Sequence, residues 1–215
     1  MKFRDRRDAG RKLLELVRKW DVRSDLVLAI PRGGVVVGYE VATGLNAELD
    51  IIMVRKIGMP GNPELAAGAV SEDGEVYVEQ EVLDLYGLDE SYVRERAAMM
   101  LGEVRERASM LRGGAERIDV RDANVLLVDD GMATGSTMIA GLRSVRKLGA
   151  KGVSVAVPVS SREALIRVSR EADRAEAVLV PEEFFAVGEF YEHFPQVEDD
   201  EVVELLRSAR RSRWA

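Results

Sequence analysis

The sequence has 215 residues, a net charge of -7 and an apolar fraction of 47%, values typical of a globular domain with a sizeable core. The absence of cysteine excludes disulfides and thiolate metal sites, and a single histidine excludes a multi-histidine metal centre. The acidic balance argues against a nucleic-acid surface and no segment predicts a signal peptide or a membrane span, so we expect a cytoplasmic protein without nucleic-acid or membrane partners.

Short apolar runs alternate with amphipathic stretches along most of the chain. Residues 26–30 and 49–54 predict the first two strands, and residues 9–20 and 35–43 predict helices. The later expected elements are strands over 125–128, 153–157 and 177–180, and helices over 89–111, 138–148, 160–172 and 199–210. This alternation indicates parallel βαβ units in a doubly wound, mainly parallel α/β sheet. We take residues 1–215 as a single domain.

Two stretches interrupt this alternation. Residues 58–78 are rich in glycine, proline and acidic residues and predict a flexible loop, with 76–78 as one hairpin strand. Residues 89–111 carry one apolar stripe against a face dense in arginine and glutamate. Because the charges on that face are of mixed sign, we expect a helical insertion that covers the sheet or forms a homodimer surface.

The most informative segment is VLLVDDGMATGST, residues 125–137. Its apolar run predicts a strand buried on both faces, and helical spacing begins at Met138. The junction therefore presents free backbone N–H groups at a helix N-terminus, which attract phosphate. Asp129 and Asp130 would repel phosphate, so we expect them to bind sugar hydroxyls or a phosphate-bound Mg²⁺.

Two other groups of residues follow predicted strands at the carboxyl edge, where open parallel sheets bind ligands. Arg32 can hold a diphosphate in bidentate fashion, and Gly33 and Gly34 permit a tight turn with exposed N–H groups. Arg55 and Lys56 end the second predicted strand. They are interpreted either as anion ligands or as solvated charges at the end of a strand.

Residues 125–137 resemble the 5-phosphoribosyl-1-diphosphate (PRPP) binding motif of type I phosphoribosyltransferases. The shared pattern is an apolar run, two acids, two variable residues, Ala or Asp, then Thr-Gly and two small residues. Residues 29–34 resemble the pyrophosphate-binding loop of that family. The resemblance implies transfer of the 5-phosphoribosyl group between PRPP and a nitrogen nucleophile such as a nucleobase, with release of pyrophosphate and with Mg²⁺ as cofactor.

The resemblance also implies a role for each part of the site. Asp129 and Asp130 would be the catalytic and metal-binding acids, reaching the ribose hydroxyls directly or through Mg²⁺. The 5-phosphate would be held by Ala133, Thr134, Gly135, Ser136 and Thr137. The pyrophosphate would be held by Arg32, Gly33, Gly34, Arg55 and Lys56, with the loop over 58–78 closing above the sugar. Members that act on hypoxanthine and guanine carry aspartate where this chain has Ala133, which weakens the expectation that the acceptor is hypoxanthine or guanine.

Residues 181–197 form the aromatic-rich part of the chain and match the position of the hood that receives the nucleobase in that family. Phe185 and Tyr191 are the candidate base-stacking side chains. The alternative is a small satellite core that buries the C-terminal helix, and for most of these aromatic residues it is the better interpretation.

Three other functions stay open at this point. A PRPP-sensing regulator would keep the sugar-phosphate site without turnover, and an accessory domain would serve another enzyme. A different phosphate-binding enzyme of the doubly wound class is disfavoured, because the loop lacks a Walker lysine and no GxGxxG follows the first strand.

Overall fold

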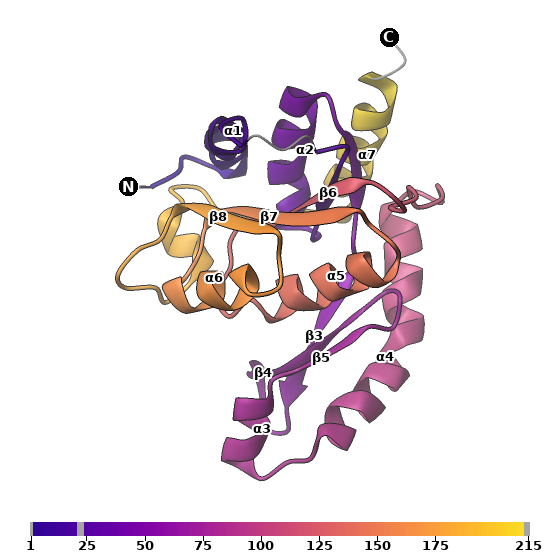
Figure 1. Ribbon diagram of the computed structural model, residues 1–215, viewed down its shortest axis with the longest axis vertical. Coiled ribbons are helices and arrows are strands. Elements are labelled where there is room, and N and C mark those ends of the chain that lie inside the picture. The colour runs from indigo at the N-terminus through magenta and orange to yellow at the C-terminus, as the bar shows by residue number, and fades with distance from the viewer. Residues whose placement is uncertain (1, 21–23, 213–215) are drawn as a thin grey trace.

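The main sheet has five strands, all parallel, in the order β2-β1-β6-β7-β8 (Figure 1). The structure is a computed structural model that describes residues 2–20 and 24–212, without the side chains of Glu64 and Ser212. The strands are β1 (Leu26–Ala29), β2 (Glu48–Ile51), β6 (Asn124–Val128), β7 (Gly152–Val159) and β8 (Arg174–Leu179). The mainly parallel α/β sheet expected from the sequence is confirmed.

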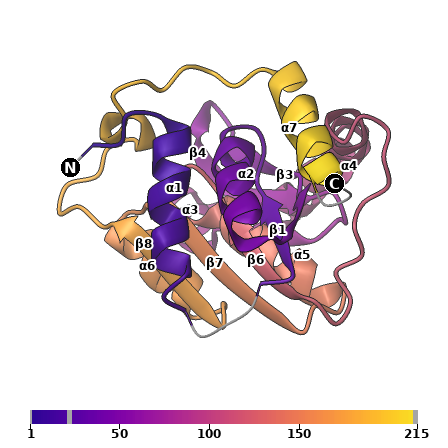
Figure 2. The ribbon, with the colours of Figure 1, turned by 90° about the horizontal axis from the view of Figure 1, so that it is seen from above.

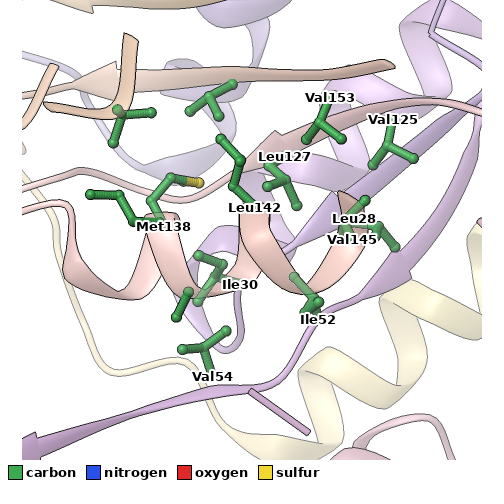
Figure 3. Close-up of a cluster of buried hydrophobic side chains, with 14 of the residues drawn as sticks. Leu28, Ile30, Ile52, Val54, Val125, Leu127, Met138, Leu142, Val145 and Val153 are labelled. Atoms are coloured by element: carbon green, nitrogen blue, oxygen red, sulfur yellow. The ribbon is translucent and has the colours of Figure 1, made fainter. Parts of the chain in front are cut away.

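Helices cover both faces of this sheet. The helices α1 (Arg6–Val17), α2 (Gly33–Leu45) and α7 (Asp199–Ser212) lie over one face, as Figure 2 shows from above. The opposite face is covered by α5 (Ser136–Lys147) and α6 (Arg162–Ser169). In Figure 3, Leu28 and Leu127 of the sheet face Met138 and Leu142 of α5. Burial on both faces explains why the central strands are continuous apolar runs.

A second sheet stands where the sequence predicted a flexible loop over 58–78, so the expectation of a continuous loop is wrong, whereas the hairpin strand expected over 76–78 is confirmed. Its antiparallel strands are β3 (Val54–Met59), β4 (Asn62–Ser71) and β5 (Val76–Val78), followed by α3 (Gln80–Tyr86) and α4 (Glu90–Leu111). Figure 1 shows these elements beyond α5, on the side away from α1 and α2. Ile57 and Val70 are buried against Val93 and Val104 of α4, so the apolar surface that stabilises these strands comes from a distant helix.

The strand expected over 49–54 divides into β2 and β3, which belong to different sheets. Arg112, just after α4, binds the residues around the point where the chain passes from β2 to the second sheet. Its guanidinium donates to Asp50 of β2 (3.0 Å), to Glu72 after β4 (2.7 and 2.9 Å) and to the carbonyl of Ile51 (2.8 Å). Arg55 and Lys56 therefore lie on β3 and not at the carboxyl end of a main-sheet strand.

Residues 181–197 form a small aromatic core with the N-terminal segment. A 3₁₀ turn, η1 (Val187–Phe190), leads into Tyr191, which forms a backbone bridge with Phe3. Phe184, Phe190 and Phe194 pack around this pair. The satellite core is thus built on Phe3, whereas the C-terminal helix α7 packs on α2 and β2. No helix in the described part of the chain is both long enough and apolar enough to cross a membrane.

Candidate functional site

The topology of the main sheet brings the predicted site segments together. β1 and β6 are neighbours, but α2 leaves β1 over one face of the sheet and α5 leaves β6 over the other. The first turns of both helices therefore open at the same carboxyl edge, which is where parallel sheets bind ligands. A cavity of about 370 Å³ lies there. It is lined by residues 30–33, 54–56, 129–135, Thr137 and Val187.

The turn at residues 133–137 has the geometry of an anion site. Gly135 has a φ of +83° and precedes α5, so the backbone bends sharply at the helix N-terminus. The carbonyl of Ala133 accepts a hydrogen bond from Ser161 (2.6 Å), and that of Thr134 accepts one from Arg167 (3.1 Å). Among the described residues, the N–H groups of Ala133, Thr134 and Gly135 have no acceptor. These free donors at a helix N-terminus can bind a phosphate.

Two carboxylates stand beside this turn. Asp129 accepts a hydrogen bond from the backbone N–H of Asp130 (2.8 Å), and the Oδ2 atom of Asp130 accepts one from Arg6 (2.7 Å). Burial, together with the neighbouring charge of Asp130, raises the pKa of Asp129 well above its ordinary value. Burial also raises the pKa of Asp130, against the opposing effect of Arg6. The carboxylate oxygens that Arg6 does not occupy can bind hydroxyl donors or a cation.

Arg6 is a site residue that the sequence did not indicate. It begins α1, donates to Asp130 and to the carbonyl of Pro195 (2.6 Å), and lies 3.8 Å from the ring centre of Phe194. Its side chain is only 10% exposed. In the sequence, Arg6 is one of several basic residues before and within the helix predicted over 9–20, so only the tertiary contact distinguishes it from the others.

Gly33 and Gly34 lie at the N-terminus of α2, directly against the two carboxylates. A Cβ atom on Gly33 would lie 1.9 Å from Oδ2 of Asp130, and one on Gly34 would lie 2.9 Å from the Cα atom of Asp129. Neither glycine has a positive φ. Close approach of two turns, and not left-handed backbone, is therefore what requires glycine here. Gly33 lines the cavity and Gly34 does not.

The predicted basic residues also meet at the cavity. Arg32 lines it, follows a cis peptide bond, and pairs with Asp199 of α7 (3.3 Å). Arg55 and Lys56 line it from β3, in the second sheet. Arg55 forms an exposed pair with Glu103 of α4 (2.7 Å), whereas the Lys56 side chain has no hydrogen bond or ion pair with a described residue. Lys56 is thus the cation best placed to receive an anion.

Besides Gly34, three predicted ligands do not line the cavity. Ser136 is fully buried and its hydroxyl donates to Glu79 (2.5 Å), so its predicted phosphate contact through that hydroxyl is wrong. Tyr191 is 4% exposed, packs between Phe3 and Phe194, and donates to the carbonyl of Asp130 (2.5 Å). It has no open ring face, so the prediction that it stacks on a base is wrong. Phe185 is 79% exposed and does not line the cavity, and its base contact stays a prediction.

Comparison with known proteins identifies the family and the fold. The sequence profile described as "Phosphoribosyl transferase domain" matches residues 6–189. A protein from Thermus thermophilus with a crystal structure is 43% identical to this chain in sequence. The two structures superpose with a TM-score of 0.82, over 97% of this chain and 99% of that chain.

Two curated relatives extend the comparison. A Mycobacterium tuberculosis protein, whose name assigns it provisionally as a phosphoribosyl transferase, matches this chain over 209 residues. The two are 40% identical there, and the match covers 97% of this chain and 47% of that protein. The chain thus spans about half the length of that curated relative. A ribose-phosphate pyrophosphokinase of Thermococcus kodakarensis is 45% identical over 58 residues, 26% of this chain and 21% of that enzyme.

Proposed function

The chain belongs to the phosphoribosyltransferase family, and we propose that it transfers the 5-phosphoribosyl group between PRPP and a nitrogen nucleophile, a nucleobase or a similar heterocycle, with release of pyrophosphate. One observation carries the proposal. A turn with free N–H donors, residues 133–137, shares a cavity with the carboxylates of Asp129 and Asp130. A ligand that satisfies both must carry a phosphate close to hydroxyl groups, as a sugar phosphate does.

In this proposal the chain acts by positioning and charge stabilisation. The 133–137 turn holds the 5-phosphate, and Asp129 and Asp130 accept hydrogen bonds from the ribose hydroxyls. Arg32 and Lys56 neutralise the leaving diphosphate as the bond from C1 to its oxygen breaks. The acceptor nitrogen forms the new bond to C1, so no protein nucleophile is required.

The donor set fits a Mg²⁺ ion held jointly with the substrate. No cluster of three or more His, Cys, Asp or Glu side chains among the described residues forms a complete cation site. Asp129 and Asp130 offer carboxylate oxygens, and Mg²⁺ in proteins is commonly bound by one or two carboxylates together with water and substrate phosphates. When bound, the ion would supply positive charge to the diphosphate.

A second candidate is a PRPP-binding domain without turnover, acting as a sensor or as an accessory to another domain. The observation that favours it is the length of the Mycobacterium tuberculosis relative, of which this chain matches 47%. This candidate shares the binding site and differs only in the absence of product.

Calorimetric titration tests both candidates. PRPP is titrated with and without Mg²⁺, with ribose 5-phosphate as a separate ligand, and nucleobases are then screened for pyrophosphate release. We expect binding of PRPP that requires Mg²⁺, followed by turnover with at least one base. Binding without turnover across the screen supports the second candidate, and failure to bind either ligand refutes both.

Variants locate the binding site. Asp129→Asn combined with Asp130→Asn is expected to abolish PRPP binding in a folded protein. The matched control is Asp119→Asn, because Asp119 is exposed and its ion pair is with Arg121, two residues further along the chain. Unchanged affinity in the double variant would refute the assignment of the two acids.

A further inference from the structure

A charged network lies behind the 133–137 turn, on the side away from the cavity. The Glu79 carboxylate, 7% exposed, accepts a hydrogen bond from Ser136 Oγ (2.5 Å) and one from Arg167 Nη2 (2.6 Å). The other end of the same guanidinium, Nη1, donates to the carbonyl of Thr134 (3.1 Å). One arginine thus connects a buried carboxylate with the backbone of the turn.

The network joins three parts of the fold. Glu79 follows β5 and directly precedes α3, Arg167 is in α6, and Ser136 begins α5. The Tyr77 hydroxyl of β5 also accepts a hydrogen bond from Arg167. None of these side chains except that of Ser136 belongs to the sequence motif. The turn is therefore held by residues that are far away in sequence.

The charges of this network affect how the turn binds an anion. A buried Glu79 carboxylate one side chain away from the turn would repel a phosphate, and Arg167 compensates that charge. The bond from Arg167 to Thr134 also holds a carbonyl dipole away from the cavity. Both effects favour an anion on the opposite side of the turn, where the N–H groups are free.

We infer that Arg167 and Glu79 are positioning residues for the 5-phosphate of the sugar ligand. Arg167 holds the 133–137 turn with its donors toward the cavity and neutralises Glu79, which in turn fixes Ser136. The inference rests on the proposed function, because it takes the occupant of the turn to be a sugar phosphate.

The test measures the affinity for ribose 5-phosphate by calorimetry. Arg167→Met removes the charge and the hydrogen bonds to Glu79, Thr134 and Tyr77, and we expect the dissociation constant to rise about tenfold or more, the size of one charge-assisted hydrogen bond. Arg117→Met is the matched control, since Arg117 pairs with Asp73 (2.6 Å), which also accepts a hydrogen bond from Ser144 of α5 (2.7 Å), without contacting the turn or the Arg167 network. We expect it to bind as the wild type does.

Two further variants distinguish a positioning role of Arg167 from a general loss of protein stability. Adding Glu79→Gln to Arg167→Met removes the uncompensated carboxylate, so we expect part of the affinity to return, although the doubly changed protein has lost more contacts. Arg167→Lys keeps one charge beside Glu79 but cannot bond to Glu79 and the Thr134 carbonyl as the guanidinium does, and we expect an intermediate affinity and a fold close to that of the wild type.

The outcomes are distinct. Equal affinity in Arg167→Met and the wild type, or equal loss in Arg167→Met and Arg117→Met, overturns the inference and leaves the proposed function standing. A further loss on adding Glu79→Gln also overturns it. Failure of the wild type to bind ribose 5-phosphate and PRPP refutes the proposed function, and the inference falls with it.

Discussion

Replacing Arg112 by methionine should strongly destabilise the protein. The Arg112 guanidinium is enclosed where β2, β4 and α4 meet, and its side chain is 5% exposed. It forms ion pairs with Asp50 (3.0 Å) and Glu72 (2.7 Å), whose side chains are 0% and 9% exposed. Methionine fills much of the same space but leaves both carboxylates buried without their cation.

The expected magnitude follows from this burial. Removing one partner of a buried ion pair costs about 3–5 kcal/mol of unfolding free energy. Asp50 and Glu72 keep backbone donors, Ile118 N–H at 2.8 Å and Met53 N–H at 2.9 Å, so we expect the lower part of that range. For a chain of this size, 3 kcal/mol corresponds to a fall in melting temperature of roughly 6–12 °C.

Urea unfolding followed by circular dichroism measures the change, with a thermal melt as a second measurement. The matched control is Arg121→Met, because Arg121 pairs with Asp119 at the surface, where the two side chains are 74% and 59% exposed. Exposed pairs contribute little, so this control should unfold like the wild type. If Arg112→Met lost no more stability than the control, the reasoning about the buried network would be refuted.

Three other substitutions test particular contacts. Gly33→Ala places a Cβ atom 1.9 Å from Asp130 Oδ2, and should cost about 1–3 kcal/mol of stability and weaken PRPP binding; calorimetry showing unaltered affinity would contradict it. Tyr191→Phe removes the bond to the Asp130 carbonyl and should cost about 1 kcal/mol in urea unfolding, without altering the affinity for any base. Hydrogen bonds from Arg107 lower the pKa of Asp199 below 3.8. Because of this lowered pKa, Asp199 contributes stability above pH 3.8, and that stability is lost as the pH falls through the lowered pKa. The difference in unfolding free energy between wild type and Asp199→Asn should therefore shrink on acidification. A difference that stays constant with pH would exclude this linkage.

The main sheet and the core of the site were predictable because their signals are local. A strand such as 125–128 is buried on both faces and must be apolar throughout, and its motif lies where the strand passes into a helix. The carboxyl edge of a parallel sheet then brings Arg32 and Asp129 together whatever the details of packing.

The second sheet was not predictable by the same means. Residues 66–69 of β4 are small, and Gly68 fits close to the carbonyl of Tyr77, where a Cβ atom would lie 2.3 Å away. Such residues read as loop when taken alone. Their strand conformation depends on α4, whose apolar stripe begins more than twenty residues further along the chain.

The sequence by itself determined the parallel α/β sheet, the turn at the start of α5 and the paired acids before it, since each depends on neighbouring residues and on strand-to-helix order. Only the tertiary structure decided which side chains complete the site. Arg6 reaches Asp130 from the N-terminal helix, and Arg167 reaches Glu79 and the turn from α6. A lone arginine on a polar helix face carries no local pattern, because its partner is specified by the packing of distant elements and not by its neighbours in sequence.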